Sequence, residues 1–149
     1  MLKHYDRIIA LVSGRIAEGV MLLFVRVALA GVFWRSGQTK IAEGTWFTIS
    51  DSAYSLFATE YKGVPLPSDM AAVMATVSEH VFPILLVIGL FTRFSALALL
   101  GMTMVIQIFV YPDAWWPVHS LWVALALVLI VRGGGLFSLD VIAVKKSRT

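Results

Sequence analysis

The sequence predicts an all-α fold, namely a polytopic membrane four-helix bundle with one additional amphipathic helix in the first outer loop. Composition is the first reason. Of the 149 residues, 59% are hydrophobic and 14% are charged, whereas ordinary soluble domains carry about 25% charged residues. The second reason is four apolar stretches that approach the roughly 20 residues needed to cross a bilayer. We therefore expect one membrane domain, residues 1–149, without a separate soluble module.

The predicted spans are residues 15–36, 70–91, 93–111 and 117–132. Before them, residues 1–14 form a basic, partly apolar leader that predicts an interfacial turn of helix. Thr92 is the predicted N-cap of the third span, because a threonine side chain can accept a hydrogen bond from the first turn. The glycine run at 133–135 is predicted to end the fourth span.

The connection between the first two spans, residues 37–69, is polar and aromatic rather than uniformly apolar. From Trp46 to Tyr61 its apolar residues recur near helical spacing, with polar residues between them. This pattern is typical of a helix that lies in the membrane interface instead of crossing it. Pro65 and Pro67 are predicted to end that helix.

Basic residues predict the orientation of the four spans. One side of the predicted bundle carries eight and the other carries three, apart from Arg26 within the membrane. The eight are Lys3, Arg7, Arg15, Arg93, Arg132, Lys145, Lys146 and Arg148; the three are Arg35, Lys40 and Lys62. By the positive-inside rule, both termini are predicted to be cytoplasmic. Since these charges flank apolar spans, they indicate a lipid bilayer as partner and require no nucleic acid.

Two ionisable residues fall inside predicted spans, where charge is costly and often marks a functional site. Arg26 and Glu79 each lie about ten residues, or roughly 15 Å, from the predicted outer ends of their helices. We therefore predict that they form a buried ion pair. Pro83 should loosen the second span, because it removes the helical bond to the carbonyl of Glu79. The pair could fix helix packing, or it could line a polar pocket open to the outer face.

Polar residues on the third and fourth spans add to this candidate pocket. Gln107 shares a face with Thr103 and Tyr111, and His119 shares one with Trp122. Such a cavity would suit an amphipathic ring, for example a quinone headgroup. Alternatively, these side chains form hydrogen bonds between helices and line no pocket.

Metal and haem chemistry find little support in the sequence. His80 and His119 differ in predicted depth by roughly 12 Å, which is too far for the two axial ligands of one haem. The chain has no cysteine, which excludes disulfides and thiolate ligands. We predict no metal site and interpret His80 as a residue of the pocket wall or of the packing.

Three segments resemble the DoxX family of membrane proteins, in the expected order. The first runs from Arg26 to Phe33 and is followed by Gly37 and Lys40. The second is Glu79 with the turn Gly89–Arg93 and Ala96, and the third is Gly133–Asp140. The sequence departs from the family pattern at Glu79–Pro83, where small residues commonly follow the glutamate.

The resemblance implies a four-helix protein of the bacterial inner membrane. Some relatives are membrane subunits of thiosulfate:quinone oxidoreductase, and others are associated with oxidative-stress or metal-handling complexes. Arg26, Lys40 and Glu79 match motif positions of the family, although no catalytic role follows from the match.

Three classes of function follow from these observations. The first is a subunit of a redox or respiratory complex with a quinone-facing polar pocket near Arg26, Glu79, Gln107 and His119. It would bind no cofactor by motif, would not be catalytic alone, and would join other membrane or redox subunits or copies of itself. The second is a non-catalytic structural or assembly subunit. The third is a small transporter of solute, proton or metal, which four spans without inverted repeats support poorly.

Overall fold

The computed structural model describes residues 9–10 and 13–146, so most of the predicted leader at 1–14, and Arg148, lie outside the described residues. Within that range the chain is helical and matches the predicted all-α class. Four helices are long and apolar enough to cross a membrane, the fourth being composite over 112–132. The helices are α2 (Arg15–Gln38), α3 (Asp51–Thr59), α4 (Ser68–Ile88), α5 (Thr92–Phe109), the short turns η1 (Pro112–Ala114) and η2 (Trp115–His119), α6 (Ser120–Arg132) and α7 (Leu139–Lys146).

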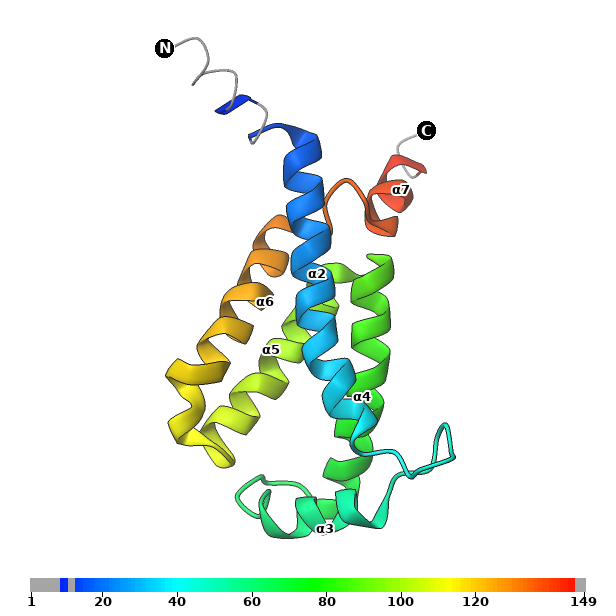
Figure 1. Ribbon diagram of the computed structural model, residues 1–149, viewed down its shortest axis with the longest axis vertical. Coiled ribbons are helices and arrows are strands. Elements are labelled where there is room, and N and C mark those ends of the chain that lie inside the picture. The colour runs from blue at the N-terminus through cyan, green and yellow to red at the C-terminus, as the bar shows by residue number, and fades with distance from the viewer. Residues whose placement is uncertain (1–8, 11–12, 147–149) are drawn as a thin grey trace.

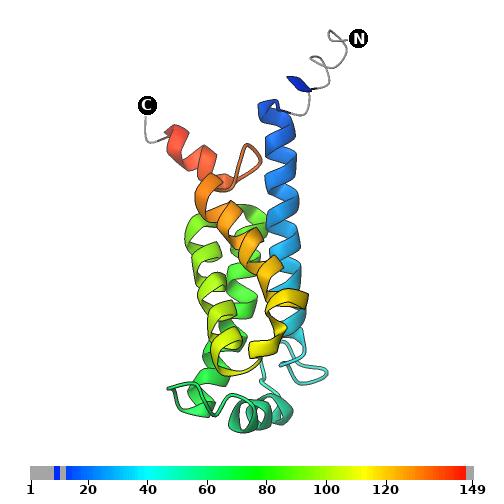
Figure 2. The ribbon, with the colours of Figure 1, turned by 90° about the vertical axis from the view of Figure 1, so that its left-hand side faces the viewer.

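The long helices form an antiparallel bundle (Figures 1 and 2). α2 packs against α4 and α6, and α5 packs against α4 and α6. The start of α2 and the whole of α7 lie at one end of the bundle, which we call the α7 end, and α3 lies across the opposite end, the α3 end (Figure 1). A short helix therefore lies at each end of the bundle, α3 from the first loop and α7 from the C-terminal segment.

Large aliphatic and aromatic side chains fill the interior, because their spacing along each helix places them on its inner face. Leu22, Leu29, Phe33, Leu86, Leu99 and Leu129 are almost completely buried there. The outward face is also apolar, with Phe24 72% and Phe94 63% exposed. Exposed apolar surface of this extent on every long helix fits contact with lipid acyl chains rather than with water.

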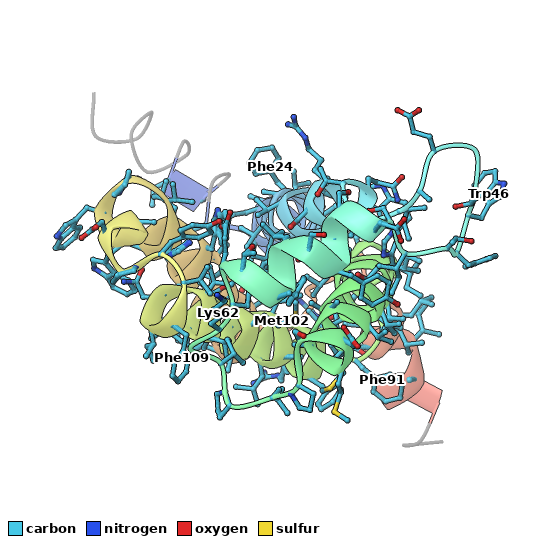
Figure 3. All side chains as sticks on the ribbon, turned by 90° about the horizontal axis from the view of Figure 1, so that it is seen from below. Phe24, Trp46, Lys62, Phe91, Met102 and Phe109 are labelled. Atoms are coloured by element: carbon cyan, nitrogen blue, oxygen red, sulfur yellow. The ribbon has the colours of Figure 1, made fainter. Side chains whose placement is uncertain are left out.

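The helix predicted in the first loop exists, but it is shorter than its pattern suggested. α3 begins after Ser50, whose side chain accepts a hydrogen bond from the Ala53 N–H at 3.2 Å. Before it, a β-bridge between Ile41 and Ile49 closes a tight loop. Trp46 extends from this loop away from the bundle (Figure 3).

Two other local features differ from the predictions, and a third prediction, at Pro83, concerns α4. Thr92 does not cap α5, because the carboxylate of Asp140 accepts from the N–H groups of both Phe91 and Thr92, at 2.8 and 2.9 Å. α7 was not predicted. The loosening predicted at Pro83 does not end α4, which continues through Pro83 to Ile88.

Candidate functional site

The six predicted site residues lie in three separate places. Glu79, Lys40 and His80 lie between α2 and α4 near the α3 end. Gln107 and His119 join α5 to η2, and Arg26 lies near the α7 end. We describe each group in turn.

The Glu79 carboxylate forms an ion pair with Lys40, the distance from Nζ to Oε2 being 2.7 Å, and both residues are buried. Ser36 completes the group, because its hydroxyl donates to Glu79 Oε1 at 3.0 Å. The Lys40 ammonium also donates to the hydroxyl and the main-chain carbonyl of Ser36, at 3.1 and 3.2 Å. Lys40 thus makes two contacts at once. Its ammonium donates to a carbonyl in the last turn of α2, where a cation is favourable, and it pairs with a carboxylate of α4.

His80, the neighbour of Glu79, bonds to α2 and to its own helix. One ring nitrogen, Nδ1, lies 2.7 Å from the Thr76 carbonyl, which can only accept, so Nδ1 carries the proton. Nε2 lies 3.0 Å from the amide nitrogen of Gln38 and can accept from it. His80 therefore fastens α4 to the end of α2, which agrees with a packing role.

Gly37 permits this close approach of α2 and α4. A Cβ atom at Gly37 would lie 2.8 Å from Cε1 of His80 and 3.1 Å from Cβ of Glu79. At Gly31, six residues earlier on the same helix, an added Cβ would have nothing within 4 Å.

This pair of glycines allows a matched prediction. Gly37→Ala should destabilise the protein by about 1–3 kcal/mol, since extra volume in a packed contact forces neighbouring groups apart. Gly31→Ala should be neutral or stabilising by up to about 1 kcal/mol, because alanine favours helix. Unfolding of the purified variants in mixed micelles would measure both values, and equal effects would contradict the close contact at Gly37.

A cavity of about 190 Å³ lies beside Glu79, between α3, α4 and α5. Its wall is mainly apolar, with Met74, Met102 and Ile106 among the lining residues. Figure 3 views the molecule from the α3 end and labels Met102 close to α3. Glu79 is the one charged residue of the wall, and Tyr61 is the other residue with a titratable side chain.

Tyr61 stays a neutral phenol in this environment. Burial, followed by the charges of Glu79, Tyr111 and Glu60, raises the pKa of Tyr61 to about 12. Its ring stacks on Phe57 of α3, with centroids 4.2 Å apart. The cavity therefore combines a mainly apolar lining with two hydroxyl residues, Tyr61 and Ser78, and the acidic Glu79, which suits a molecule with a ring and carbonyl oxygens.

Arg26 is completely buried, but its partners are main-chain carbonyls rather than Glu79. Nη1 donates to the carbonyls of Leu86 and Val87 at 3.1 and 3.3 Å, and Nη2 donates to that of Phe137 at 2.5 Å. The first two belong to the last turn of α4, where carbonyls lack helical donors. The predicted Arg26–Glu79 ion pair is therefore wrong.

The error comes from assuming that the first two spans end at the same level. Glu79 bonds to Ser36, which lies near the end of α2. The eleven residues of α4 that precede Glu79 therefore extend beyond the end of α2, and α3 packs against them. Arg26 lies ten residues before Ser36 on α2, a distance of about 15 Å along the helix. It therefore lies beside the opposite end of α4, the C-terminal end. Gly89 makes room for it, since a Cβ there would lie 2.1 Å from Nη1.

Gln107 and His119 form a third group, which bonds the two ends of the turn between α5 and α6. His119 Nδ1 lies 2.7 Å from Gln107 Oε1, and the Gln107 amide donates to the Pro112 carbonyl at 2.6 Å. His119 is buried against the ring of Trp122. Neither residue lines the cavity beside Glu79, so this group fits the alternative of hydrogen bonds between helices.

Sequence reasoning missed Tyr61 and Ser36 as site residues. Ser36 lies four residues before Lys40, and this spacing on one helix face was a usable signal. The sequence around Tyr61 contains no such signal, because the approach of Tyr61 to Glu79 depends on how α3 folds back over α4.

Comparison with known proteins shows which family the chain belongs to. The sequence profile of the DoxX family matches residues 21–112. An uncharacterized protein of Haemophilus influenzae is 34% identical over 146 residues, an alignment that covers 87% of each chain. No solved structure matches the chain. The matched residues span α2 to the start of the α5–α6 turn and include Arg26, Lys40 and Glu79, and the chain belongs to the DoxX family.

Proposed function

We propose that the protein is a membrane subunit of a redox or respiratory complex and that the cavity beside Glu79 binds a quinone headgroup. The observation that carries this proposal is the cavity itself, which places Glu79, Tyr61 and Ser78 in an otherwise apolar wall. Binding pockets for small molecules commonly combine a mainly apolar lining with a few polar groups.

The residues around the cavity have separate roles in this proposal. The neutral Tyr61 hydroxyl donates a hydrogen bond to a quinone carbonyl. Met102, Val105 and Ile106 of α5 contact the ring and the start of the isoprenoid tail, which leaves toward lipid. Glu79, held by Lys40, fixes the polar side of the wall. The chain would bind and position the quinone, and a redox partner would supply the electrons.

The test is competitive photolabelling in proteoliposomes. A photoreactive short-chain quinone should label peptides that contain residues 57–66 or 102–106, and short-chain ubiquinone should suppress that labelling. Tyr61→Phe should weaken the competition about fivefold, the value of one hydrogen bond of roughly 1 kcal/mol. Tyr54→Phe is the matched control, because Tyr54 packs on the same α3–α4 cluster but does not line the cavity.

Labelling spread evenly over the lipid-facing helices, or equal competition in wild type and Tyr61→Phe, would reject the quinone site. The subunit proposal has its own readout, since native purification in mild detergent should recover a redox protein at fixed stoichiometry.

A structural or assembly subunit remains the second candidate, and one observation favours it. The charges of Glu79 and Lys40 satisfy each other together with Ser36, so the pair can stabilise the bundle without any ligand. In that case, variants of the pair would lower stability while the activity of the assembled complex survives.

We also propose that the protein lies in the bacterial inner membrane with both termini in the cytoplasm. Support comes from Arg93 and Arg132 at the α7 end. The absence of native cysteine allows a direct test with single-cysteine variants. Ser13→Cys should be shielded from an impermeant maleimide added to spheroplasts, whereas Glu43→Cys should react; the reverse pattern would invert the topology.

A further inference from the structure

A second and larger cavity, of about 610 Å³, lies at the α7 end. One wall is the start of α5, with Thr92 and Arg93, and the other is the segment that follows α6, with Gly133, Gly134 and Asp140. The glycine run ends α6 as predicted, and the structure shows in addition that it forms part of this cavity. None of these residues belongs to the proposed quinone site.

The charged groups around this cavity leave one cation without a carboxylate partner. Arg132 pairs with Glu18. Both carboxylate oxygens of Asp140 accept from main-chain N–H groups at the start of α5. Among the described residues, Arg93 has no carboxylate within ion-pair distance; it donates only to the Ile130 carbonyl, at 2.8 Å, and its guanidinium retains further N–H groups.

A buried hydroxyl in the cavity wall also lacks a partner. Thr92 is completely buried, and its Oγ1 makes no hydrogen bond. It lies beside Gly134, where a Cβ would come within 2.7 Å of this oxygen. A buried hydroxyl without a partner costs about 1–3 kcal/mol. Because Thr92 is among the residues that line the cavity, an acceptor bound there would offset this cost.

We propose that this cavity binds a phosphate group, carried either by an anionic phospholipid or by a soluble phosphate. A phosphate oxygen accepts from the Thr92 hydroxyl, and the guanidinium of Arg93 supplies the compensating charge. Gly133 leaves room for Arg93 at this place, because a Cβ there would lie 3.3 Å from Arg93 Nε.

The surroundings of the cavity suit both sources of the phosphate. Phe91 and Phe94 are each 63% exposed on either side of Arg93, and Phe91 points outward in the view of Figure 3. Apolar side chains on both sides of a cation at the end of a span place that cation near the level of lipid headgroups. A soluble phosphate could enter through the same opening from the water beyond α7.

The experiment compares two variants and a control in the full-length protein. Thr92→Val keeps the shape of the side chain and removes a hydroxyl that has no protein partner, so the fold should persist. Arg93→Gln removes the charge but retains a donor for the Ile130 carbonyl. Ser95→Ala is the matched control, because Ser95 Oγ is likewise buried and without a partner but does not line the cavity.

One arm uses nanodiscs of phosphatidylcholine with or without phosphatidylglycerol, and native mass spectrometry counts the retained phospholipid. The other arm titrates inorganic phosphate against protein in phosphatidylcholine alone, observed by phosphorus NMR. Each of Thr92→Val and Arg93→Gln should weaken binding about tenfold or more, the loss of one hydrogen bond to a charged group, while Ser95→Ala should bind as wild type does.

Selective retention of phosphatidylglycerol that both variants reduce supports a lipid headgroup. Phosphate binding without lipid selectivity, weakened by the same variants, supports a soluble phosphate. Absence of both kinds of binding, or wild-type binding by Thr92→Val, overturns the proposal. Loss of binding by Ser95→Ala as well would also overturn it, because the effect would not then belong to this cavity.

Discussion

Replacing Arg26 with methionine is expected to lower the free energy of unfolding by about 2–4 kcal/mol. The carbonyls of Val87 and Phe137, both in partly buried contacts, would lose the Arg26 donor. A carbonyl left unpaired away from water costs about 1–3 kcal/mol. Leu86 is affected less, because its carbonyl also accepts from the Gly89 N–H. Unfolding in mixed micelles measures the total effect.

A local measurement distinguishes this explanation from a general loss of packing. Because Arg26 holds the Phe137 carbonyl, Arg26→Met should speed chymotrypsin cleavage after Phe137 under native conditions. Leu29→Ala, a core variant one turn away, should lower stability without a comparable gain in cleavage at that bond. Slow cleavage in Arg26→Met would show that Arg26 does not hold the segment from Gly133 to Asp140.

Replacing Lys40 with methionine is expected to cost about 3–5 kcal/mol, the usual effect of removing one partner from a buried ion pair. The Glu79 carboxylate would retain only the Ser36 hydroxyl as donor while staying 97% buried in the bundle, since its exposed fraction is 3%. Equilibrium unfolding of the variant gives the value directly.

Double variants test both assignments at once. Lys40→Met with Glu79→Gln should cost clearly less than the sum of the two single variants, because the two side chains are in contact. Arg26→Met with Glu79→Gln should be additive within about 0.5 kcal/mol, because they share no partner. Strong coupling of Arg26 to Glu79 would restore the ion pair that the sequence predicted and contradict the structure.

The fold could be predicted from the sequence because membrane spans depend on a local property. Length and hydropathy of each apolar stretch are sufficient to locate α2, α4 and α5 within a few residues. The amphipathic pattern located α3, although its start depended on Ser50 as N-cap. α7 escaped prediction because eight residues ending in two lysines resemble a solvated tail.

The candidate site could be predicted only in part, because its contacts depend on the relative levels of helices. Glu79 was identified correctly as buried, whereas its partner was not. The choice between Arg26 and Lys40 depends on how far α4 extends beyond α2, and no local pattern encodes that distance. The same limit applies to the start of α5, whose N–H groups bond to Asp140, 48 residues later.

The position of Arg26 has a consequence for how the chain is made. Arg26 enters the membrane with the first span, while the Phe137 carbonyl that it binds follows 111 residues later. During synthesis Nη1 can therefore find its acceptors, the carbonyls of Leu86 and Val87, once α4 is inserted, whereas Nη2 obtains its own acceptor only after the last span. A chain interrupted before Gly133 would leave Arg26 Nη2 without the Phe137 acceptor, a partly unpaired guanidinium by which membrane proteases could distinguish unfinished from finished protein.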